Sequence, residues 1–120
     1  MNAPEEIVLK PLGWVGSSRR DFDIMPREVQ RKFGYALYIA QRGGKHESAK
    51  PLRGFGGAGV VEVVSDHRGD TFRCVYTARI ADAIYVLHTF QKKSTRGIAT
   101  ARSDIEIIKR RLREAEEHAR

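Results

Sequence analysis

The sequence predicts an α+β fold with a small antiparallel β-sheet in the order β-α-β-β-β-α and helices packed on one face. Three runs rich in β-branched and aromatic residues, at 60–65, 71–80 and 83–91, are separated only by short turns, so they must be antiparallel neighbours. Apolar residues recur at helical spacing before and after these runs. The second face of the sheet is therefore expected to be free for a ligand.

One strand and one helix are expected in the first part of the chain. The strand spans residues 7–15, and Pro11 within it is typical of an edge strand with a bulge or bend. The helical pattern starts from Asp21, Pro26 suits a first helical position, and Gly43-Gly44 ends the helix. The apolar stripe of this helix consists of Val29, Phe33, Leu37 and Ala40.

A glycine-rich loop and a final helix complete the expected elements. Residues 45–59 mix Lys, Ser, Pro and glycines, which predicts an exposed loop without regular structure. The final helix follows possible caps at Thr100 and Ser103. Its narrow apolar face consists of Ile105, Ile108, Leu112 and Ala115.

The chain is basic and has a single cysteine. Its 22 Lys and Arg against 15 Asp and Glu give a net charge of +7, which favours an anionic partner, most often nucleic acid, with an anionic membrane or acidic protein as alternatives. Cys74 alone cannot form an internal disulfide. No apolar stretch approaches the roughly 18 residues of a membrane span, and the Glu5-Glu6 start does not resemble a signal peptide. We expect one cytoplasmic domain over residues 1–120.

Neither a metal site nor a phosphate-binding loop is indicated by the sequence. The four histidines are scattered, and no paired carboxylates or Cys/His spacing would close a coordination shell. Glycines are dense in residues 52–59, but no Lys-Ser or Lys-Thr followed by a helix comes after them. A nucleotide-binding function therefore has little support.

The last two expected strands carry the main candidates for chemistry. Strand alternation places Arg73 and Arg79 on one face of the strand 71–80. A second set shares one side of the next strand or directly follows it: His88, Phe90, Lys92 and Lys93. Fixed cations can stabilise charge on a phosphate, and a histidine can move the proton when a ribose 2′-hydroxyl attacks that phosphate. An aromatic ring could stack on an unpaired base, so the set suits RNA cleavage without a metal.

For several residues a structural role is the simpler interpretation. Cys74 and Tyr76 lie on the apolar face of their strand, where an inert buried thiol and a core ring are expected. A lone strand histidine such as His88 is more often structural, and only its basic neighbours favour a function. Lys109-Arg110-Arg111 and Arg113 are most simply the solvated face of the last helix.

Motifs along nearly the whole chain carry a family resemblance through their order and spacing. They are Lys10-Pro11-Leu12-Gly13-Trp14-Val15-Gly16-Ser17-Ser18, Met25-Pro26-Arg27-Glu28-Val29, Lys50-Pro51-Leu52, Gly59-Val60-Val61-Glu62-Val63, Phe72-Arg73-Cys74-Val75-Tyr76 and, above all, Tyr85-Val86-Leu87-His88-Thr89-Phe90-Gln91-Lys92-Lys93-Ser94. With them the chain resembles the phage-related, HigB-like branch of the RelE/ParE toxins. One departure is Val64, because family members usually carry an arginine two residues after the glutamate that stands here as Glu62.

The resemblance implies a RelE-like sheet that takes mRNA in the ribosomal A site and cuts it without a metal or cofactor. The implied partners are the ribosome, mRNA and an antitoxin protein from an adjacent gene, with no membrane. Basic strand residues carry the site in this superfamily. The expected catalytic residues are Arg73, His88, Lys92 and Lys93. The expected RNA-binding residues are Arg79, Phe90, Arg96 and Arg53.

Two other functions stay open at this point. A ParE-like poison of DNA gyrase shares the fold but acts by binding a protein. A non-catalytic nucleic-acid-binding module would need positive charge alone. The basic strand that bears His88 favours the nuclease, because nuclease chemistry needs those groups and gyrase binding does not.

Overall fold

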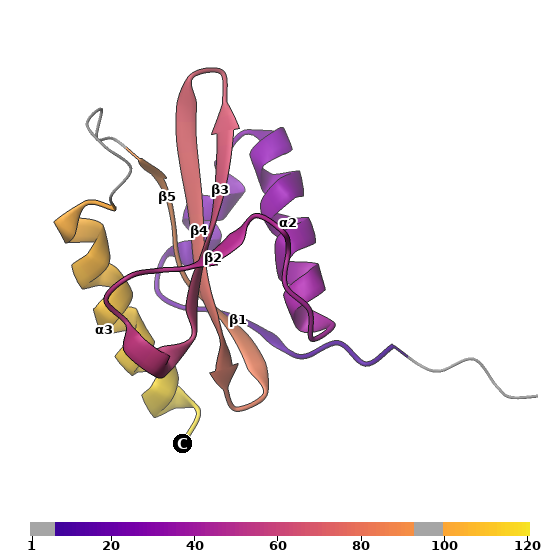
Figure 1. Cartoon of the computed structure of the whole chain (residues 1–120), viewed down its shortest axis with the longest axis vertical. Coiled ribbons are helices and arrows are strands. Elements are labelled where there is room, and N and C mark those ends of the chain that lie inside the picture. Colours follow the sequence, from indigo (N-terminus) through magenta and orange to yellow (C-terminus); the bar gives the residue numbers. More distant parts are fainter. Residues whose placement is uncertain (1–6, 93–99) are drawn as a thin grey trace, which may run out of the picture.

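The computed structural model describes residues 7–92 and 100–120, which form one five-stranded sheet and three α-helices (Figure 1). In chain order the elements are β1 (Leu12–Trp14), α1 (Ser18–Asp23), α2 (Arg27–Gln41), β2 (Ala49–Pro51), the 3-10 turn η1 (Gly56–Ala58), β3 (Val60–His67), β4 (Asp70–Ile80), β5 (Ala83–Lys92) and α3 (Arg102–His118). The strand order across the sheet is β1-β5-β4-β3-β2. The fold is mixed α+β, as the sequence predicts.

The centre of the sheet consists of the three strands predicted from their β-branched and aromatic runs. β3 pairs with β4 and β4 pairs with β5, both antiparallel, which confirms the prediction from the short turns. The turn between β3 and β4 holds Arg68 and Gly69 at positive φ, the backbone geometry of tight hairpins.

The two edge strands are short. β1 covers only three of the residues 7–15 predicted for it, and it pairs in parallel with β5. The chain before Pro11 instead runs along the end of α2, where the Lys10 amide donates to the Gln41 carbonyl and the Gln41 side chain donates back to the Lys10 carbonyl, both at 2.9 Å. β2 lies inside the segment 45–59 that was predicted to lack regular structure, and it pairs with β3. Pro51 is tolerated there because β2 is an edge strand.

The predicted first helix is two helices. The residue before a proline disfavours helical backbone angles, and Met25 precedes Pro26 in the break between α1 and α2. Pro26 is the N-cap residue, so α2 starts one residue later than predicted. Among the helices of the described residues, none is long and apolar enough to cross a membrane.

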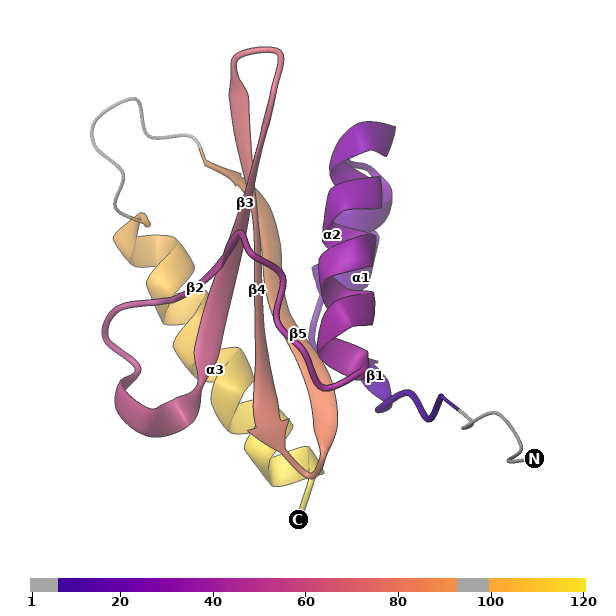
Figure 2. The same cartoon turned by 45° about the vertical axis from the view of Figure 1, so that its right-hand side comes forward.

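The helices cover both faces of the sheet, which corrects the prediction that one face stays free. The side chains of α2 join one hydrophobic cluster with alternate residues of β3, β4 and β5. Ile108 and Ala115 of α3 join a second cluster with Val75 and Leu87. Figure 2 shows α1 and α2 on one side of the sheet and α3 on the other. The prediction failed because the apolar face of α3 was identified without evidence of which sheet face it would cover.

A β-bulge in β5 decides which side chains face α3. Val75 of β4 is paired with His88, but the next residue, Tyr76, is paired with Val86, so Leu87 is an extra residue. The bulge reverses the alternation of β5 at this point. As a result Leu87 and His88, although adjacent, both lie against α3.

We predict that Phe33→Ala destabilises the protein by about 3–5 kcal/mol, because it removes a ring of the α2 core that is 0% exposed. Tyr35→Ala, two residues along the same helix, truncates a ring that is 59% exposed and should change the free energy of unfolding by only about 0.5 kcal/mol. Urea denaturation of both variants measures the difference. Equal losses would contradict the assignment of the inner face of α2.

Candidate functional site

Charged and polar side chains from four elements meet between the sheet and α3. We call them the polar cluster: Glu62 of β3, Arg73 of β4, His88 of β5, and Asp104 and Arg111 of α3. Arg73 and His88 are only 5% and 6% exposed. Buried charged groups are retained only where other groups satisfy them, so the contacts within the cluster determine its chemistry.

Arg73 is held by Glu62 and by the chain that leads into α3. Its Nη1 donates to Glu62 Oε2 at 2.7 Å and to Thr100 Oγ1 at 3.0 Å. The Thr100 hydroxyl donates to the same Glu62 oxygen at 3.1 Å. The arginine predicted to be catalytic is thus part of a closed ion pair beneath the start of α3.

Both ring nitrogens of His88 are hydrogen-bonded. Nε2 lies 2.8 Å from Asp104 Oδ1, and Nδ1 lies 3.3 Å from Arg111 Nη1. Because a guanidinium can only donate, Nδ1 accepts and the ring proton lies on Nε2, directed at Asp104. The ring also stacks on Phe90, with centroids 4.3 Å apart.

Burial is the main influence on the pKa of His88. Loss of solvent lowers this pKa below its ordinary value, the hydrogen bond and charge of Asp104 oppose that shift, and the charge of Arg111 adds to it. The ring is therefore neutral at pH 7. A neutral imidazole with an ionised carboxylate on one nitrogen is the form that a general base requires.

Arg111 corrects a sequence prediction, because it is buried and does not belong to the solvated face of α3. It donates to the Leu87 carbonyl at 3.0 Å and to Ser17 Oγ at 2.9 Å, in addition to His88. Gly16 has a φ of +58°, and a Cβ there would lie 2.6 Å from Arg111 Nε, so a larger residue does not fit. The sequence contains a pattern that could have indicated this burial. Arg111 follows Asp104 and Ile108 and precedes Ala115 at helical spacing, which places it on the inner face of α3.

The predicted caps of the last helix are also corrected. α3 begins at Arg102 with Ala101 as its N-cap residue, and no side chain caps it. The Thr100 hydroxyl is instead bonded to Glu62 and Arg73. Thr100, which was predicted to cap the helix, contacts the sheet instead. A sequence pattern cannot distinguish these two uses of a threonine hydroxyl.

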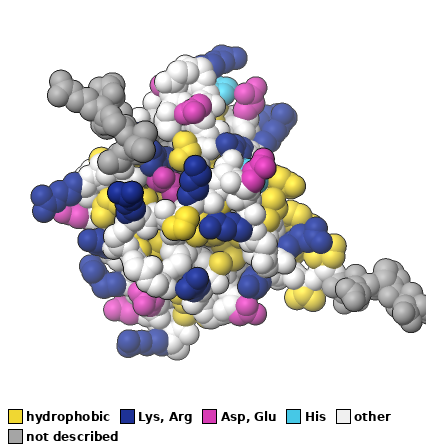
Figure 3. Space-filling view, in the orientation of Figure 1, with side chains coloured by type: hydrophobic (Ala, Val, Ile, Leu, Met, Phe, Trp, Pro, Cys, Tyr) yellow, Lys and Arg dark blue, Asp and Glu magenta, His cyan; other side chains and the backbone are white. Residues whose placement is uncertain are grey.

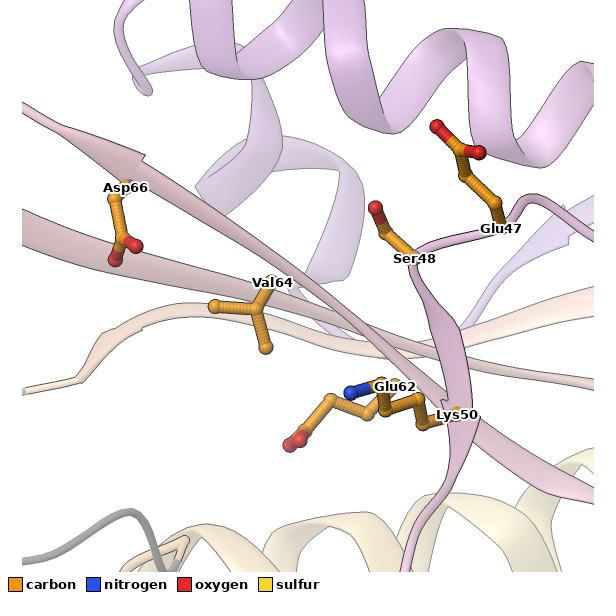
Figure 4. Close-up of a pocket in the computed structure, with 6 residues that line it drawn as sticks. All are labelled: Glu47, Ser48, Lys50, Glu62, Val64 and Asp66. Atoms are coloured by element: carbon orange, nitrogen blue, oxygen red, sulfur yellow. The ribbon is translucent and has the colours of Figure 1, made fainter.

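Two surface depressions reach the polar cluster from opposite sides. One of about 330 Å³ lies beside α1 and is lined in part by Asp21, His88 and Phe90. The other, of about 460 Å³, lies at the β3 edge, where Figure 4 shows Glu62 beside Lys50. Its charged lining residues are Glu47, Glu62, Asp66 and Lys50. Three carboxylates against one lysine disfavour a phosphate there.

The structure brings together only part of the predicted site. Arg73, His88 and Phe90 face α3 from neighbouring strands, with Arg73 paired to Phe90, and Lys92 follows at the end of β5 paired to Thr71. Arg79 and Arg53 lie at the glycine loop, and Arg79 is six residues or about 20 Å from Arg73 along β4. Lys93 and Arg96 lie outside the described residues.

The remaining candidates are structural, as the simpler interpretation predicted. Cys74 is fully buried, and burial raises the pKa of its thiol to about 12, which removes it as a nucleophile. Burial also raises the pKa of Tyr76 to about 12, with a smaller effect of Cys74. Within residues 7–92 and 100–120, no three His, Cys, Asp or Glu side chains are grouped so that they could hold a metal ion.

Comparison with known proteins identifies the family. The model of the family described as phage derived protein Gp49-like (DUF891) matches residues 20–113, most of the chain. The chain belongs to this family. The Gp49-like protein is similar to the crystal structure of the toxin-antitoxin complex RelBE2 from Mycobacterium tuberculosis, with a TM-score of 0.45 and 19% identity, covering 76% of this chain and 100% of the other. At that level the function of the complex does not transfer. No curated protein matches the sequence significantly.

We predict that His88→Gln flattens the pH dependence of stability below neutrality. The folded-state pKa of His88 lies below its ordinary value of 6.5, so the unfolded chain binds the proton first as the pH falls. The contribution of the neutral ring to the free energy of unfolding is fully present above about pH 6.5. It is lost progressively as the pH falls from there toward the folded-state pKa. Urea denaturation between about pH 7 and pH 5 measures this slope in wild type and variant.

The matched control is His118→Gln, which removes an exposed histidine near the end of α3. Its slope should follow that of wild type. If His88→Gln and wild type lost stability in parallel, His88 would not be the buried neutral group that the geometry indicates.

Proposed function

We propose that the Gp49-like protein is the toxin of a type II toxin-antitoxin system and acts as a metal-independent endoribonuclease on ribosome-bound mRNA. The observation that carries this proposal is the convergence of Arg73, His88 and Phe90 on one sheet face, near Lys92 at the end of β5. These are a phosphate-binding cation, an acid-base group, a stacking ring and a second cation. The full set needed for RNA cleavage is supplied by two neighbouring strands.

The proposed reaction is an attack of a ribose 2′-oxygen on the adjacent phosphorus. His88 takes the 2′-proton, a bond forms from O2′ to phosphorus, and the bond from phosphorus to O5′ breaks. The leaving O5′ takes up a proton from water and His88 returns its proton to solvent, so the products are a 2′,3′-cyclic phosphate and a 5′-hydroxyl. Arg73 and Lys92 stabilise the negative charge that builds on the phosphate oxygens in the transition state.

The described conformation holds the site closed under α3. The Asp104 carboxylate and the Arg111 guanidinium occupy the two nitrogens of His88, and Thr100 lies against Arg73. RNA must therefore take the place of at least one of the contacts on His88 before the ring can accept the 2′-proton. The depression beside α1, which His88 and Phe90 line in part, is the proposed route of RNA to the site.

The target and the partner rest on the sequence resemblance. The resemblance to the RelE/ParE toxins supports the ribosome and mRNA as target, and the net charge of +7 favours binding to both. A cell that carries such a nuclease needs a neutralising protein, which the resemblance gives as an antitoxin. Val64 pairs with Arg73 across β3 and β4, at the position where family members usually carry a second arginine. The proposed activity therefore depends more heavily on Arg73 and Lys92 than it would with that arginine present.

We predict that Arg73→Ala and Lys92→Ala each lower the cleavage rate by about 10²–10³-fold, because each removes a cation held against the phosphate. Arg113→Ala, on the exposed face of α3, should leave the rate nearly unchanged. The measurement is single-turnover cleavage of mRNA on purified ribosomes. Circular dichroism shows whether Arg73→Ala, which leaves Glu62 without its ion pair, still folds. Equal effects in all three variants would mean that positive charge acts diffusely and would overturn the catalytic model.

In cells, we predict that expression of the chain alone stops protein synthesis before DNA synthesis. The reason is that the proposed substrate is mRNA under translation. Pulse labelling with methionine and thymidine measures the order, and Lys92→Ala is the control expected to permit growth. If DNA synthesis stopped first while methionine incorporation continued, the protein would act as a gyrase poison instead.

A further inference from the structure

The outward face of α2 carries an exposed stripe of cations and aromatic rings. Arg31, Tyr35, Tyr38 and Arg42 are spaced so that they share one side of the helix, opposite the buried Val29 and Phe33. Tyr35 is 59% exposed and Tyr38 is 37% exposed. Large exposed rings beside arginines are unusual for a face that has only solvent to contact.

Contacts within this stripe hold the rings in position. The Arg42 guanidinium lies 5.8 Å from the centroid of the Tyr38 ring, and the His46 ring meets the Tyr35 ring edge-on at 5.8 Å. The acidic residue near the start of α2, Glu28, is directed to His67 at 3.2 Å. The stripe itself consists of positive and aromatic side chains.

A glycine-lined pocket continues the stripe beyond the end of α2. It has a volume of about 380 Å³, and its lining includes Gly44, Lys45, Gly56, Gly57, Gly59 and Arg79. Lys45 and Arg79 are its charged lining residues among the part of the chain that the structure describes. Arg79 is oriented by a hydrogen bond to the Gly57 carbonyl at 3.2 Å.

Glycine leaves the backbone of this pocket open to a ligand. No atom lies within 4 Å of the position that a Cβ would take at Gly56 or Gly57, so neither glycine is required by packing within the chain. Gly56 has a φ of +53°, which glycine adopts without strain. Backbone that is free of side chains allows a phosphate group to approach closely between two cations.

The chemistry of this surface fits an unpaired polyanion with flat rings. In Figure 3, where β2 and the glycine loop are in front, many Lys and Arg side chains, with some Asp and Glu among them, lie around patches of hydrophobic side chains. A second copy of the chain would place like charges against each other, which is unfavourable. Single-stranded RNA offers phosphates to the cations and bases to the tyrosines.

We propose that the α2-glycine surface, defined as Arg31, Tyr35, Tyr38, Arg42, Lys45 and Arg79, binds single-stranded RNA. Bases stack on Tyr35 and Tyr38, and a phosphate enters the glycine-lined pocket between Lys45 and Arg79. The surface is separate from the polar cluster, because α2 covers the sheet face opposite to α3 and Arg79 lies six residues, about 20 Å, from Arg73 along β4. It holds RNA without cutting it, so this inference goes beyond the proposed nuclease and does not require it.

The test is the binding of a fluorescent, fully 2′-O-methylated single strand of about ten nucleotides, measured by anisotropy over a range of salt concentrations. This strand has no free 2′-hydroxyl and cannot be cut by the proposed reaction. The double variant Lys45→Ala/Arg79→Ala should weaken binding by about tenfold or more and lower the salt slope by about 1.4, because two phosphate contacts are lost. The control Lys109→Ala/Arg113→Ala removes the same two charges from exposed positions of α3 and should change Kd by less than about twofold.

The aromatic half of the surface has its own variants. Tyr35→Leu and Tyr38→Leu should each weaken binding by about fivefold or more, and Tyr38→Phe should bind like wild type because it keeps the stacking ring. These helix-surface changes also keep the test valid if loss of Arg79 disturbs the glycine loop. Thermal melting verifies that each variant is folded.

Several results would overturn the proposal: no binding by wild type, equal losses in the two double variants, or tighter binding of an RNA duplex than of the single strand. The outcome is independent of the nuclease proposal, since His88→Gln should abolish cleavage of natural mRNA and still bind the methylated strand. If His88→Gln lost binding as well, RNA would occupy the polar cluster and the second surface would not exist.

Discussion

The buried guanidinium of Arg111 is the contact on which the arrangement of this protein depends. It binds the Leu87 carbonyl at the β5 bulge, the Nδ1 atom of His88 and the Ser17 hydroxyl, and so joins α3, the sheet and the start of α1. A buried cation is tolerated only when such groups satisfy it, and breaking one buried partner leaves the charge uncompensated. The path of α3 across the sheet is therefore specified by polar contacts as well as by its apolar residues.

The same network determines the state of the candidate site. Burial and the charge of Arg111 keep His88 neutral, and hydrogen bonds to Asp104 and Arg111 orient its ring. Glu62 and Thr100 hold Arg73 in a fixed position. This is preorganisation of the groups that RNA cleavage would require, under a helix that also closes them off. The two sides of the sheet then differ in character: the α3 side holds buried charged groups and a buried histidine, and α2 presents exposed cations and rings.

The sequence alone determined the α+β class, the three central strands and the residues of the α2 core. These features depend on local periodicity and on turns too short for anything but antiparallel pairing. It also identified Arg73, His88 and Phe90 as one set, because each faces the same side of its strand. The burial of Cys74 and Tyr76 followed from the apolar face of β4. Each of these conclusions needs only neighbours in the chain.

Only the tertiary structure decided that α3 covers the second face of the sheet and that Arg111 is buried. An amphipathic helix has an inner face in the sequence but no indication of what that face will contact. The β5 bulge, one inserted residue, likewise has no local pattern, yet it turns His88 toward α3. Contacts between segments that are distant in the chain determine such features. A single sequence contains the residues that form these contacts but does not show which of them are partners.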